Sequence, residues 1–229
     1  MVKLSIIATP IGNLKDITLR ALEVLQVCDG VICEDSRRTS ILLNTYQIKK
    51  PFIILNNFNE NRIFHQIIKR LLAGENLCLV SDGGTPLISD PGYKLIRSCL
   101  EQGIEVDSLP GPSSVITALT LSGLPPDKFL FLGYLPEKLG KRIKQLQELN
   151  AISLTLSATY IIFVAPHKLI RTLENMLEVY GDIEVVLAKE LTKIHQSVIK
   201  QTISSWLTDF HSAVAGPKGE VVLLFNLSS

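Results

Sequence analysis

The chain has 229 residues, which is room for one large α/β domain or two small ones. Hydrophobic residues make up 46% and charged residues 20%, a globular composition that excludes a largely disordered protein. The 23 Lys and Arg residues nearly balance the 22 Asp and Glu residues, and the net charge of +1 excludes a protein that binds nucleic acid through overall basicity, so any such contact needs a local basic patch.

Short apolar runs alternate with helical patterns through the first half of the chain. Strands are predicted at 4–8, 31–33, 52–55, 77–80 and 104–109. Helices are predicted at 17–27, 39–46, 60–73, 93–101 and 113–122. Asp16 stands where the N-cap of the first helix belongs, and Gly74 stops the third helix. Alternation of this kind is typical of a mostly parallel sheet with helices on both faces.

A Gly-Leu-Pro-Pro segment at 123–126 interrupts the alternation, and we place a domain boundary there, with domains at 1–122 and 123–229. Strands are then predicted at 129–134, 160–164, 184–188, 197–202 and 220–227. Helices are predicted at 139–149 and 168–180. We interpret the last two strands as antiparallel. The sequence therefore predicts a two-domain α/β protein, with a mostly parallel sheet in the N-terminal domain and a mixed sheet in the C-terminal domain.

Four loops that follow predicted strands are rich in Gly, Pro and small polar residues. They span 8–14, 34–39, 81–92 and 110–114. One such loop alone is also an ordinary strand-to-helix turn. Because the carboxyl ends of parallel strands lie at one edge of a sheet, we expect the four loops to form one ligand pocket. The sequence has no G-x-x-x-x-G-K-[ST] motif and no G-x-G-x-x-G after the first strand, which disfavours ordinary nucleotide sites.

The cysteines and histidines show no pattern of a metal or redox site. No C-x-x-C or H-x-x-x-H spacing occurs, so we expect buried free thiols, a reducing compartment and no zinc. The residues concerned are Cys28, Cys33, Cys78, Cys99, His65, His167, His195 and His211. Residues 1–8 form a strand pattern and no run reaches about 18 apolar residues, so we expect a soluble, cytoplasmic protein.

The motifs in these loops resemble those of the tetrapyrrole methylase superfamily. They are ATPIGNLKDITLRAL (8–22), EDSR (34–37), SDGGTPLISDPG (81–92) and PGPS (110–113). The resemblance continues in the second half with FLGYLP (131–136), GKR (140–142), PHK (166–168), ELTK (190–193) and PKGE (217–220). Within the superfamily the chain is similar to a subfamily that methylates small-subunit ribosomal RNA, and the resemblance covers nearly the whole chain.

The resemblance implies a two-domain enzyme, usually a homodimer, that binds S-adenosylmethionine in a cleft between its domains. The subfamily methylates the ribose 2′-oxygen of a cytidine in the decoding centre. Backbone N–H groups in Gly-rich turns suit the cofactor carboxylate, and Asp82 either accepts from its ammonium or ribose or caps a turn. The cofactor residues that the resemblance implies are Pro10, Gly12, Asp82, Gly83, Gly84, Thr85, Pro86, Ser113, Ser114, Leu132, Gly133, Leu191, Pro217, Lys218 and Gly219.

A ribose hydroxyl is a poor nucleophile, so a base or a cation that stabilises the developing alkoxide should help. Candidates are Glu34, Asp35, Arg37, Glu190 and Lys193. We favour Asp35 or Glu190 for orienting the hydroxyl and Arg37 or Lys193 for engaging a phosphate. An equally good interpretation of Glu34, Asp35 and Arg37 is a structural ion-pair network.

One local basic run is a candidate RNA contact. On a helix, its cations spread over a solvent-facing arc, which favours contact with rRNA phosphates or else a merely solvated face. The run consists of Lys138, Lys141, Arg142 and Lys144.

The chain departs from the subfamily pattern at three places. FVAPHK (163–168) replaces Y-E-S-P-H-R, so Val164 and Ala165 stand where Glu and Ser are usual. NNFNE (56–60) replaces H-E-H-N-E, and the usual serine-rich stretch is altered to Lys138-Leu-Gly140. Two alternatives stay open. One, a methylase of corrinoid precursors from the same superfamily, is disfavoured by the basic run and by the first motif. The other, an inactive cofactor-binding protein associated with the ribosome, is motivated by the Glu that Val164 replaces.

Overall fold

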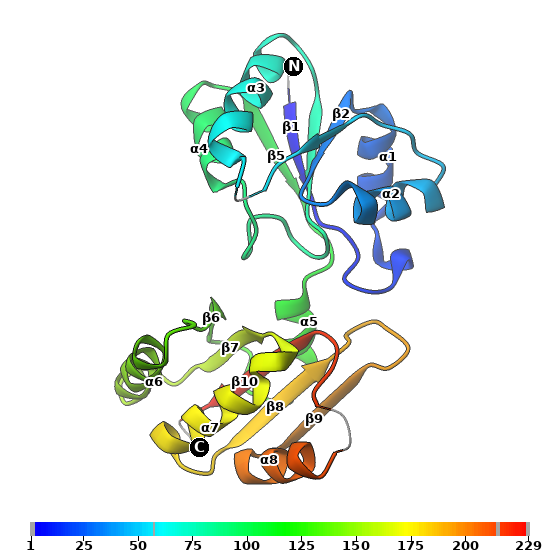
Figure 1. The fold of residues 1–229 in the computed structure, drawn as a ribbon. Coiled ribbons are helices and arrows are strands. Elements are labelled where there is room, and N and C mark those ends of the chain that lie inside the picture. Colours follow the sequence, from blue (N-terminus) through cyan, green and yellow to red (C-terminus); the bar gives the residue numbers. More distant parts are fainter. Residues whose placement is uncertain (1–2, 57, 214–215, 228–229) are drawn as a thin grey trace. The chain divides into compact units, whose positions relative to one another are not determined.

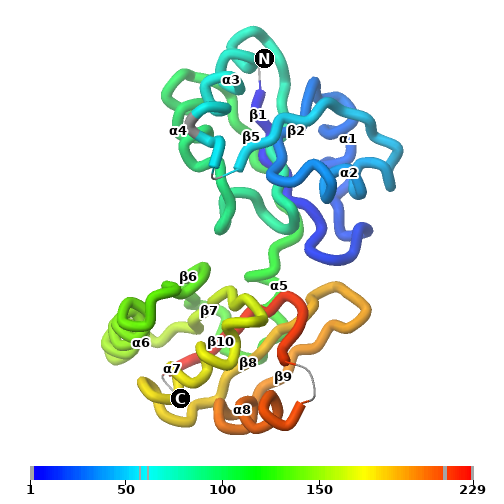
Figure 2. The backbone as a smooth tube through the Cα atoms, in the orientation of Figure 1, coloured from blue at the N-terminus to red at the C-terminus, as the bar shows by residue number. Residues whose placement is uncertain are grey.

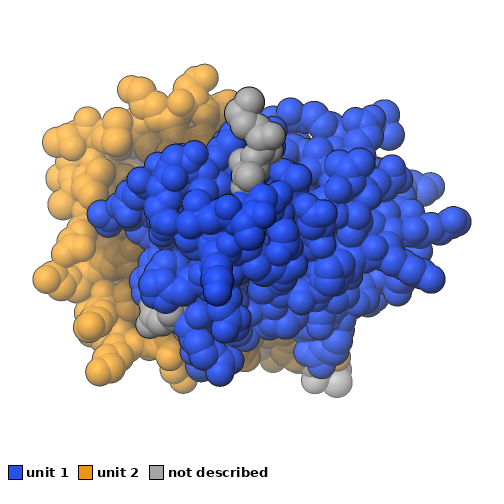
Figure 3. All heavy atoms as spheres, turned by 90° about the horizontal axis from the view of Figure 1, so that it is seen from above, with its two compact units in different colours: residues 1–113 blue, residues 114–229 orange. Residues whose placement is uncertain are grey.

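The computed structural model describes residues 3–56, 58–213 and 216–227. It divides into two compact units, Met1–Ser113 and Ser114–Ser229 (Figure 3). The boundary predicted after residue 122 would leave the helix α5 (Ser114–Leu121) in the first domain. The structure instead groups α5 with the second unit, because it packs against that unit's strand β10 (Val221–Asn226).

The first unit contains a five-stranded sheet in which every strand pairing is parallel, in the order β3-β2-β4-β1-β5. Its strands are β1 (Lys3–Ile7), β2 (Gly30–Cys33), β3 (Phe52–Ile54), β4 (Leu77–Val80) and β5 (Glu105–Leu109). In the central strand, Ile7 lies beside Val80 on one side and Leu109 on the other. The side chains of β2 and β4 are buried throughout, as expected for a sheet covered on both faces.

Helices cover both faces of this sheet, as predicted (Figure 1). The helices α1 (Leu19–Val27) and α2 (Ser36–Thr45) pack on one face in a core that includes Leu25 and Leu42. The helices α3 (Glu60–Leu72) and α4 (Tyr93–Glu101) pack on the other in a core that includes Ile67 and Leu95. Each strand thus contributes to two apolar layers.

The first helix begins later than predicted, and Asp16 is not its N-cap. Asp16 ends a short 3₁₀ helix, η1 (Leu14–Asp16), and the cap of α1 is Thr18, whose hydroxyl accepts the Ala21 N–H at 3.2 Å. The helix α2 begins earlier than predicted because Asp35 caps it, accepting the Arg37 N–H. The predicted stop at Gly74 is confirmed by its φ of +104°, which favours glycine.

The second unit contains a mixed sheet in the order β6-β7-β10-β8-β9, which confirms the prediction. The pair β6–β7 is parallel, whereas β10 pairs antiparallel with β7 and β8, and β8 pairs antiparallel with β9. The strands other than β10 are β6 (Phe129–Tyr134), β7 (Thr159–Val164), β8 (Glu184–Lys189) and β9 (Ser197–Thr202). The helices other than α5 are α6 (Leu139–Ser153), η2 (Pro166–Lys168), α7 (Leu169–Tyr180) and α8 (Ile203–Ser212).

The helix α8 was missed by the sequence analysis. Its buried residues Ile203, Trp206 and Leu207 have helical spacing, and Thr202 caps it by accepting the Ser205 N–H. Together with α6 and α7 it closes one core over the sheet, in which the rings of Tyr160 and Phe225 stack 5.2 Å apart. The path of the backbone through this unit can be followed in Figure 2.

The four cysteines are free and buried, which confirms their prediction as small core residues. Among the residues described, no helix is both long and apolar enough to span a membrane.

Candidate functional site

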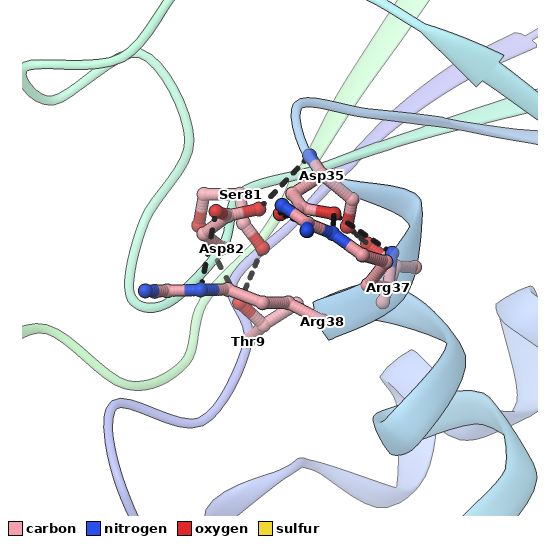
Figure 4. Close-up of polar contacts among 7 residues, drawn as sticks. Thr9, Asp35, Arg37, Arg38, Ser81 and Asp82 are labelled. Atoms are coloured by element: carbon pink, nitrogen blue, oxygen red, sulfur yellow. Dashed lines mark hydrogen bonds and ion pairs between the residues drawn. The ribbon is translucent and has the colours of Figure 1, made fainter.

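The four loops predicted to share a pocket meet at the carboxyl edge of the first sheet. Thr9, after β1, and Gly84, after β4, exchange two backbone hydrogen bonds of 2.9 and 2.8 Å. The Thr9 hydroxyl donates to the Ser81 carbonyl at 3.0 Å (Figure 4), and the Thr85 hydroxyl donates to the Pro112 carbonyl at 3.2 Å. These contacts join the loops after β1, β4 and β5 into one structure.

Two glycines allow this close approach of the loops. Gly84 has φ +94°, and a Cβ atom added at Gly111 would lie 3.0 Å from the Cβ of Ala8. In the same loop as Gly84, the side-chain-bearing residues Leu87 and Ser89 also have positive φ values of 73° and 68°. Strained backbone of this kind concentrates at ligand-binding segments. The backbone therefore makes the loop 81–92 a candidate ligand-binding segment.

Asp35, Arg37 and Asp82 form a polar network beside these loops (Figure 4). The Asp35 carboxylate accepts bonds from Arg37 Nε at 3.0 Å and Nη2 at 2.6 Å, and Asp82 accepts the Asp35 N–H at 3.2 Å. The Arg37 side chain lowers the pKa of Asp35 to about 2, with a further contribution from the Arg37 N–H. Arg38 Nε lies 3.6 Å from the second Asp82 oxygen. The geometry supports the structural interpretation of this cluster, in which Asp35 caps α2.

A pocket with a volume of about 10 Å³, room for one water-sized group, lies at the ends of β2 and β4 and is lined by carboxyl and apolar groups. Glu34 and Asp90 supply the carboxyl groups, and Pro86 is a further member of its wall. Burial, followed by the charges of Glu34 and Asp82, raises the pKa of Asp90 to about 6. Burial and Asp82 also raise the pKa of Glu34. The complete lining is Cys33, Glu34, Leu55, Leu79, Val80, Ser81, Pro86, Asp90 and Pro91.

Asp90 was not among the predicted site residues. Within the described chain, no hydrogen bond or ion pair engages its carboxyl group, which is the reverse of the situation at Asp35. The signal was present in the sequence, because Asp90 precedes Pro91 and Gly92 in a loop that follows a buried strand. What the sequence did not reveal was that Asp90 lies close to Glu34.

The motifs ELTK and PKGE come together in the second unit. Glu190 Oε1 accepts the Glu220 N–H at 2.7 Å and a bond from Lys193 Nζ at 3.1 Å, while Lys193 Nζ also lies 3.0 Å from Glu220 Oε2. The Glu220 N–H and Lys193 lower the pKa of Glu190. A Cβ atom added at Gly219 would lie 2.6 Å from Glu190 Oε1, so the carboxylate packs directly on that loop. Leu191 is buried beside it.

Of the remaining predicted residues, Leu132 and Gly133 lie on β6, and the others lie on or next to the segments already described. Gly133 has φ +63° where the β6–β7 register shifts, next to Leu132. Pro10 approaches the turn after β4, because a Cβ atom at Gly83 would lie 3.3 Å from the Pro10 carbonyl. Gly12 and Lys218 are exposed, Pro217 is half-buried, and Ser113 and Ser114 follow β5 at the start of α5. The structure thus joins the loops of the first unit by hydrogen bonds, and in the second unit it brings Glu190 and Lys193 against the loop 217–220.

Comparison with known proteins identifies the family of this chain. The chain matches the family described as Tetrapyrrole (Corrin/Porphyrin) Methylases over residues 3–206. The chain belongs to the tetrapyrrole methylase family. It is 41% identical over 228 residues to Ribosomal RNA small subunit methyltransferase I of Thermotoga maritima, covering 99% of each chain. It is 43% identical over 223 residues to the protein of that name from Escherichia coli O157:H7, covering 97% of this chain and 77% of the relative. The resemblance stated from the motifs is confirmed.

Solved structures confirm the fold of this tetrapyrrole methylase. A cobalt precorrin-4 methyltransferase is similar with a TM-score of 0.71 and 18% identity, over 97% of this chain and 94% of the other. A diphthine synthase is similar with a TM-score of 0.71 and 15% identity, over 97% and 89%. At these identities the likeness concerns the fold alone.

The prediction that Arg142 lies on a solvent-facing arc is wrong for this tetrapyrrole methylase. Its side chain is buried, Nε donates to Asn175 Oδ1 at 2.7 Å, and Nη1 donates to the Pro136 and Glu137 carbonyls, each at 3.0 Å. Arg142 therefore fixes the connection between β6 and α6 instead of facing a ligand. The three lysines of the basic run are exposed, and Lys144 lies 3.8 Å from Glu148.

The residues that depart from the family pattern lie partly in the core of the second unit and partly in a hydrogen-bonded loop of the first unit. Val164 is buried in the core of the second unit, with Leu169 and Val221, so a valine suits its position. Asn56 and Asn59 bond to one another near the start of α3. Asn57 lies outside the described residues.

Proposed function

We propose that the chain is an S-adenosylmethionine-dependent methyltransferase that modifies the ribose 2′-oxygen of a decoding-centre cytidine, position 1402 of 16S rRNA. The observation that carries this proposal is identity of about 40% over nearly the whole chain with proteins named Ribosomal RNA small subunit methyltransferase I. The four joined loops of the first unit support it, because they provide the elements that such a cofactor needs.

The residues at the carboxyl edge fit S-adenosylmethionine by charge. The cofactor carries an ammonium and a sulfonium, and Asp90 and Glu34 offer carboxylates with no ion pair among the described residues. Asp82 adds negative charge beside them. The backbone of the turn at Gly83–Thr85 suits the cofactor's polar groups, because glycine allows close approach. When bound, the cofactor supplies an electrophilic methyl group.

We assign Asp90 the cationic end of the cofactor. A carboxyl group with a pKa of about 6 is mostly ionised at neutral pH, and a bound cation lowers that pKa further. Because Asp90 is half-buried, its charge is less screened by water than that of an exposed carboxylate. Glu34 shares this role from the end of β2.

Asp35 and Glu190, the carboxylates favoured from the sequence, are better suited to orienting the 2′-hydroxyl than to accepting its proton. The lowered pKa values of Asp35 and Glu190 make both poor proton acceptors near neutral pH. We propose that either one acts, if it touches the ribose, by accepting a hydrogen bond that orients the 2′-hydroxyl. Orientation supplies much of the rate in a direct displacement, up to about 7–11 kcal/mol in favourable cases.

Each unit holds a candidate cation for rRNA phosphates. The Arg37 side chain is 88% exposed in spite of its bond to Asp35, whereas Lys193, the candidate of the second unit, is already paired with Glu190 and Glu220. We propose that Lys138, Lys141 and Lys144 contact phosphates as well, without Arg142. The homodimer, the sharing of the cofactor by both domains and the cytoplasmic location stay predictions; the four free thiols suit a reducing compartment.

Labelled S-adenosylmethionine tests the function. The protein is incubated separately with unmodified small subunits, naked small-subunit rRNA and tetrapyrroles, and any labelled nucleotide is located by mass spectrometry. We expect label on one cytidine ribose. Label on a base would overturn the 2′-O assignment, label on a tetrapyrrole would favour the corrinoid-precursor alternative, and tight cofactor binding without transfer would favour the inactive one.

A further inference from the structure

Phe58 is a fully exposed aromatic ring at the carboxyl edge of the first sheet. Its relative exposure is 101%, higher than that of the other exposed large apolar residues in the described part of the chain. It lies between β3 and α3, in the segment where this chain departs from the family pattern. A single exposed apolar residue needs no explanation by itself, so the backbone and charges around it decide its meaning.

Two asparagines hold the backbone that carries Phe58. Asn56 Oδ1 accepts the N–H groups of Phe58 and Asn59, each at 3.1 Å. Asn59 returns the contact by accepting the Asn56 N–H at 2.9 Å, and its side-chain amide donates to the Ile54 carbonyl at 3.0 Å. The backbone N–H of Phe58 is thus held by a side-chain hydrogen bond, which lowers the entropy cost of using the ring in a contact.

One end of this turn lines the small pocket that holds Glu34 and Asp90, and the other end contacts the loop after β4. On one side Leu55 lines the pocket with Glu34 and Asp90, and its N–H donates to the Cys33 carbonyl at 2.9 Å. On the other side Glu60 Oε1 accepts the Gly92 N–H at 3.2 Å. Phe58 therefore lies on a segment whose two ends contact the carboxyl edge of the first sheet.

The exposed face of α3 continues from Phe58 with positive charge. Arg62, His65 and Lys69 are exposed along it, whereas Ile67 and Leu71 face the core. Within the described residues, no carboxylate forms an ion pair with Arg62 or Lys69. The face therefore combines one aromatic ring with cations available to an anionic partner.

We propose that Phe58 and this face of α3 bind the substrate RNA strand next to the target nucleotide, with Phe58 stacking on a base and Arg62 and Lys69 contacting phosphates. An aromatic ring beside cations is the combination with which proteins hold single-stranded nucleic acid. The inference rests on the proposed function, because it requires that the substrate be RNA. It places the strand contact on the first unit, separate from the lysines of α6.

Substitution of Phe58 tests the stacking by steady-state methylation of unmodified small subunits. In Phe58→Ala and Phe58→Leu we expect KM for the subunits to rise roughly 5- to 100-fold, while the dissociation constant of S-adenosylmethionine stays unchanged. Phe58→Trp keeps a ring and should restore KM. Leu19→Ala is the matched control, because Leu19 is 79% exposed in the same unit but lies on α1. Equal KM values for all variants would overturn the proposal.

Fluorescence gives a second measurement that a purely structural role would not change. The single natural tryptophan, Trp206, is buried at 5% exposure, so the added indole of Phe58→Trp should dominate any change on titration with naked small-subunit rRNA. We expect its emission to be quenched by stacking. Unchanged emission on binding would overturn the proposal, as would loss of oligomeric assembly in Phe58→Ala by analytical ultracentrifugation, since the ring would then cover another protein copy.

A charge variant separates the phosphate contacts from the ring. In Arg62→Gln with Lys69→Gln, the salt dependence of RNA binding should weaken by about one unit of log-log slope per lost contact, whereas Phe58→Ala should keep the wild-type slope. An unchanged slope in the double variant overturns the phosphate part. If the wild-type protein labels no RNA at all, the proposed function fails. If it labels RNA and all variants match it, this inference alone fails.

Discussion

The carboxylates of the two units differ in the groups that surround them. In the first unit, Asp90 and Glu34 lie half-buried near other acidic groups, and their pKa values are raised. In the second unit, Glu190 accepts a backbone N–H and a lysine ammonium, and its pKa is lowered. A carboxylate without a partner is open to a cationic ligand, whereas one whose acceptors are engaged holds a loop in place. Residue type alone does not distinguish the two.

Asp90→Asn should give the largest change in cofactor affinity. Because it removes the negative charge assigned to the cofactor's cationic end, we expect the affinity for S-adenosylmethionine to fall by about 30-fold or more at pH 7.5, about 2 kcal/mol or more. Glu190→Gln should change that affinity less than about threefold. Isothermal titration calorimetry measures both. A stronger loss in Glu190→Gln than in Asp90→Asn would reverse the comparison.

Arg142 and the exposed lysines extend the comparison to cations. Arg142→Met removes the donor for Asn175 Oδ1 and two backbone carbonyls, so we expect a loss of about 3 kcal/mol in the free energy of unfolding. Lys141→Gln with Lys144→Gln should leave that free energy within about 0.5 kcal/mol and reduce the salt slope of rRNA binding. Urea unfolding and binding at several salt concentrations are the measurements. A stable Arg142→Met protein with a reduced slope would return Arg142 to the RNA surface.

The sequence predicted most of the fold because its local patterns agree with the long-range packing. The strand at Leu77–Val80 and the helix at Tyr93–Glu101 have the predicted bounds, since buried apolar runs and helical periodicity are local properties. The meeting of the four loops followed from parallel topology. The prediction failed where partners distant in sequence decide. Arg142 is buried where Asn175 accepts its bond, and the pKa of Asp90 is raised by burial and then by the nearby charges of Glu34 and Asp82.

Opposite pH dependence of stability is a third way to test the comparison. The folded pKa of Asp90 is about 6 and its ordinary value is 3.8, so between about pH 4 and 6 the folded state binds more protons than the unfolded state, and stability falls as pH rises. Asp90→Asn should therefore be more stable than wild type at pH 7.5, on the order of 1 kcal/mol after allowance for solvent, with no difference below about pH 4.

Glu190 should show the other sign. Its folded pKa lies below the ordinary value of 4.5, so its contribution to stability is present above that pH and is lost as pH falls through the folded pKa. Glu190→Gln should be less stable than wild type at pH 7.5, and the difference should shrink in acid. Thermal unfolding of both variants from pH 3 to 8 checks the pair of signs. Parallel curves for Asp90→Asn and Glu190→Gln would contradict it.

A small effect on stability and on cofactor binding is expected at Asp35, the carboxylate of the first unit that most resembles Glu190. Asp35 accepts the Arg37 N–H at 2.9 Å as the cap of α2, and loss of an N-cap costs about 1 kcal/mol in the free energy of unfolding. Asp35→Ser keeps a capping oxygen and should recover most of that stability, whereas Asp35→Ala should not. Neither should weaken cofactor binding more than about threefold, because the carboxylate is already engaged by Arg37. If Asp35→Ser binds S-adenosylmethionine as weakly as Asp90→Asn, the presence of hydrogen-bond or ion-pair partners does not separate ligand-binding carboxylates from structural ones. The distance of each carboxylate from the bound cofactor then has to separate them.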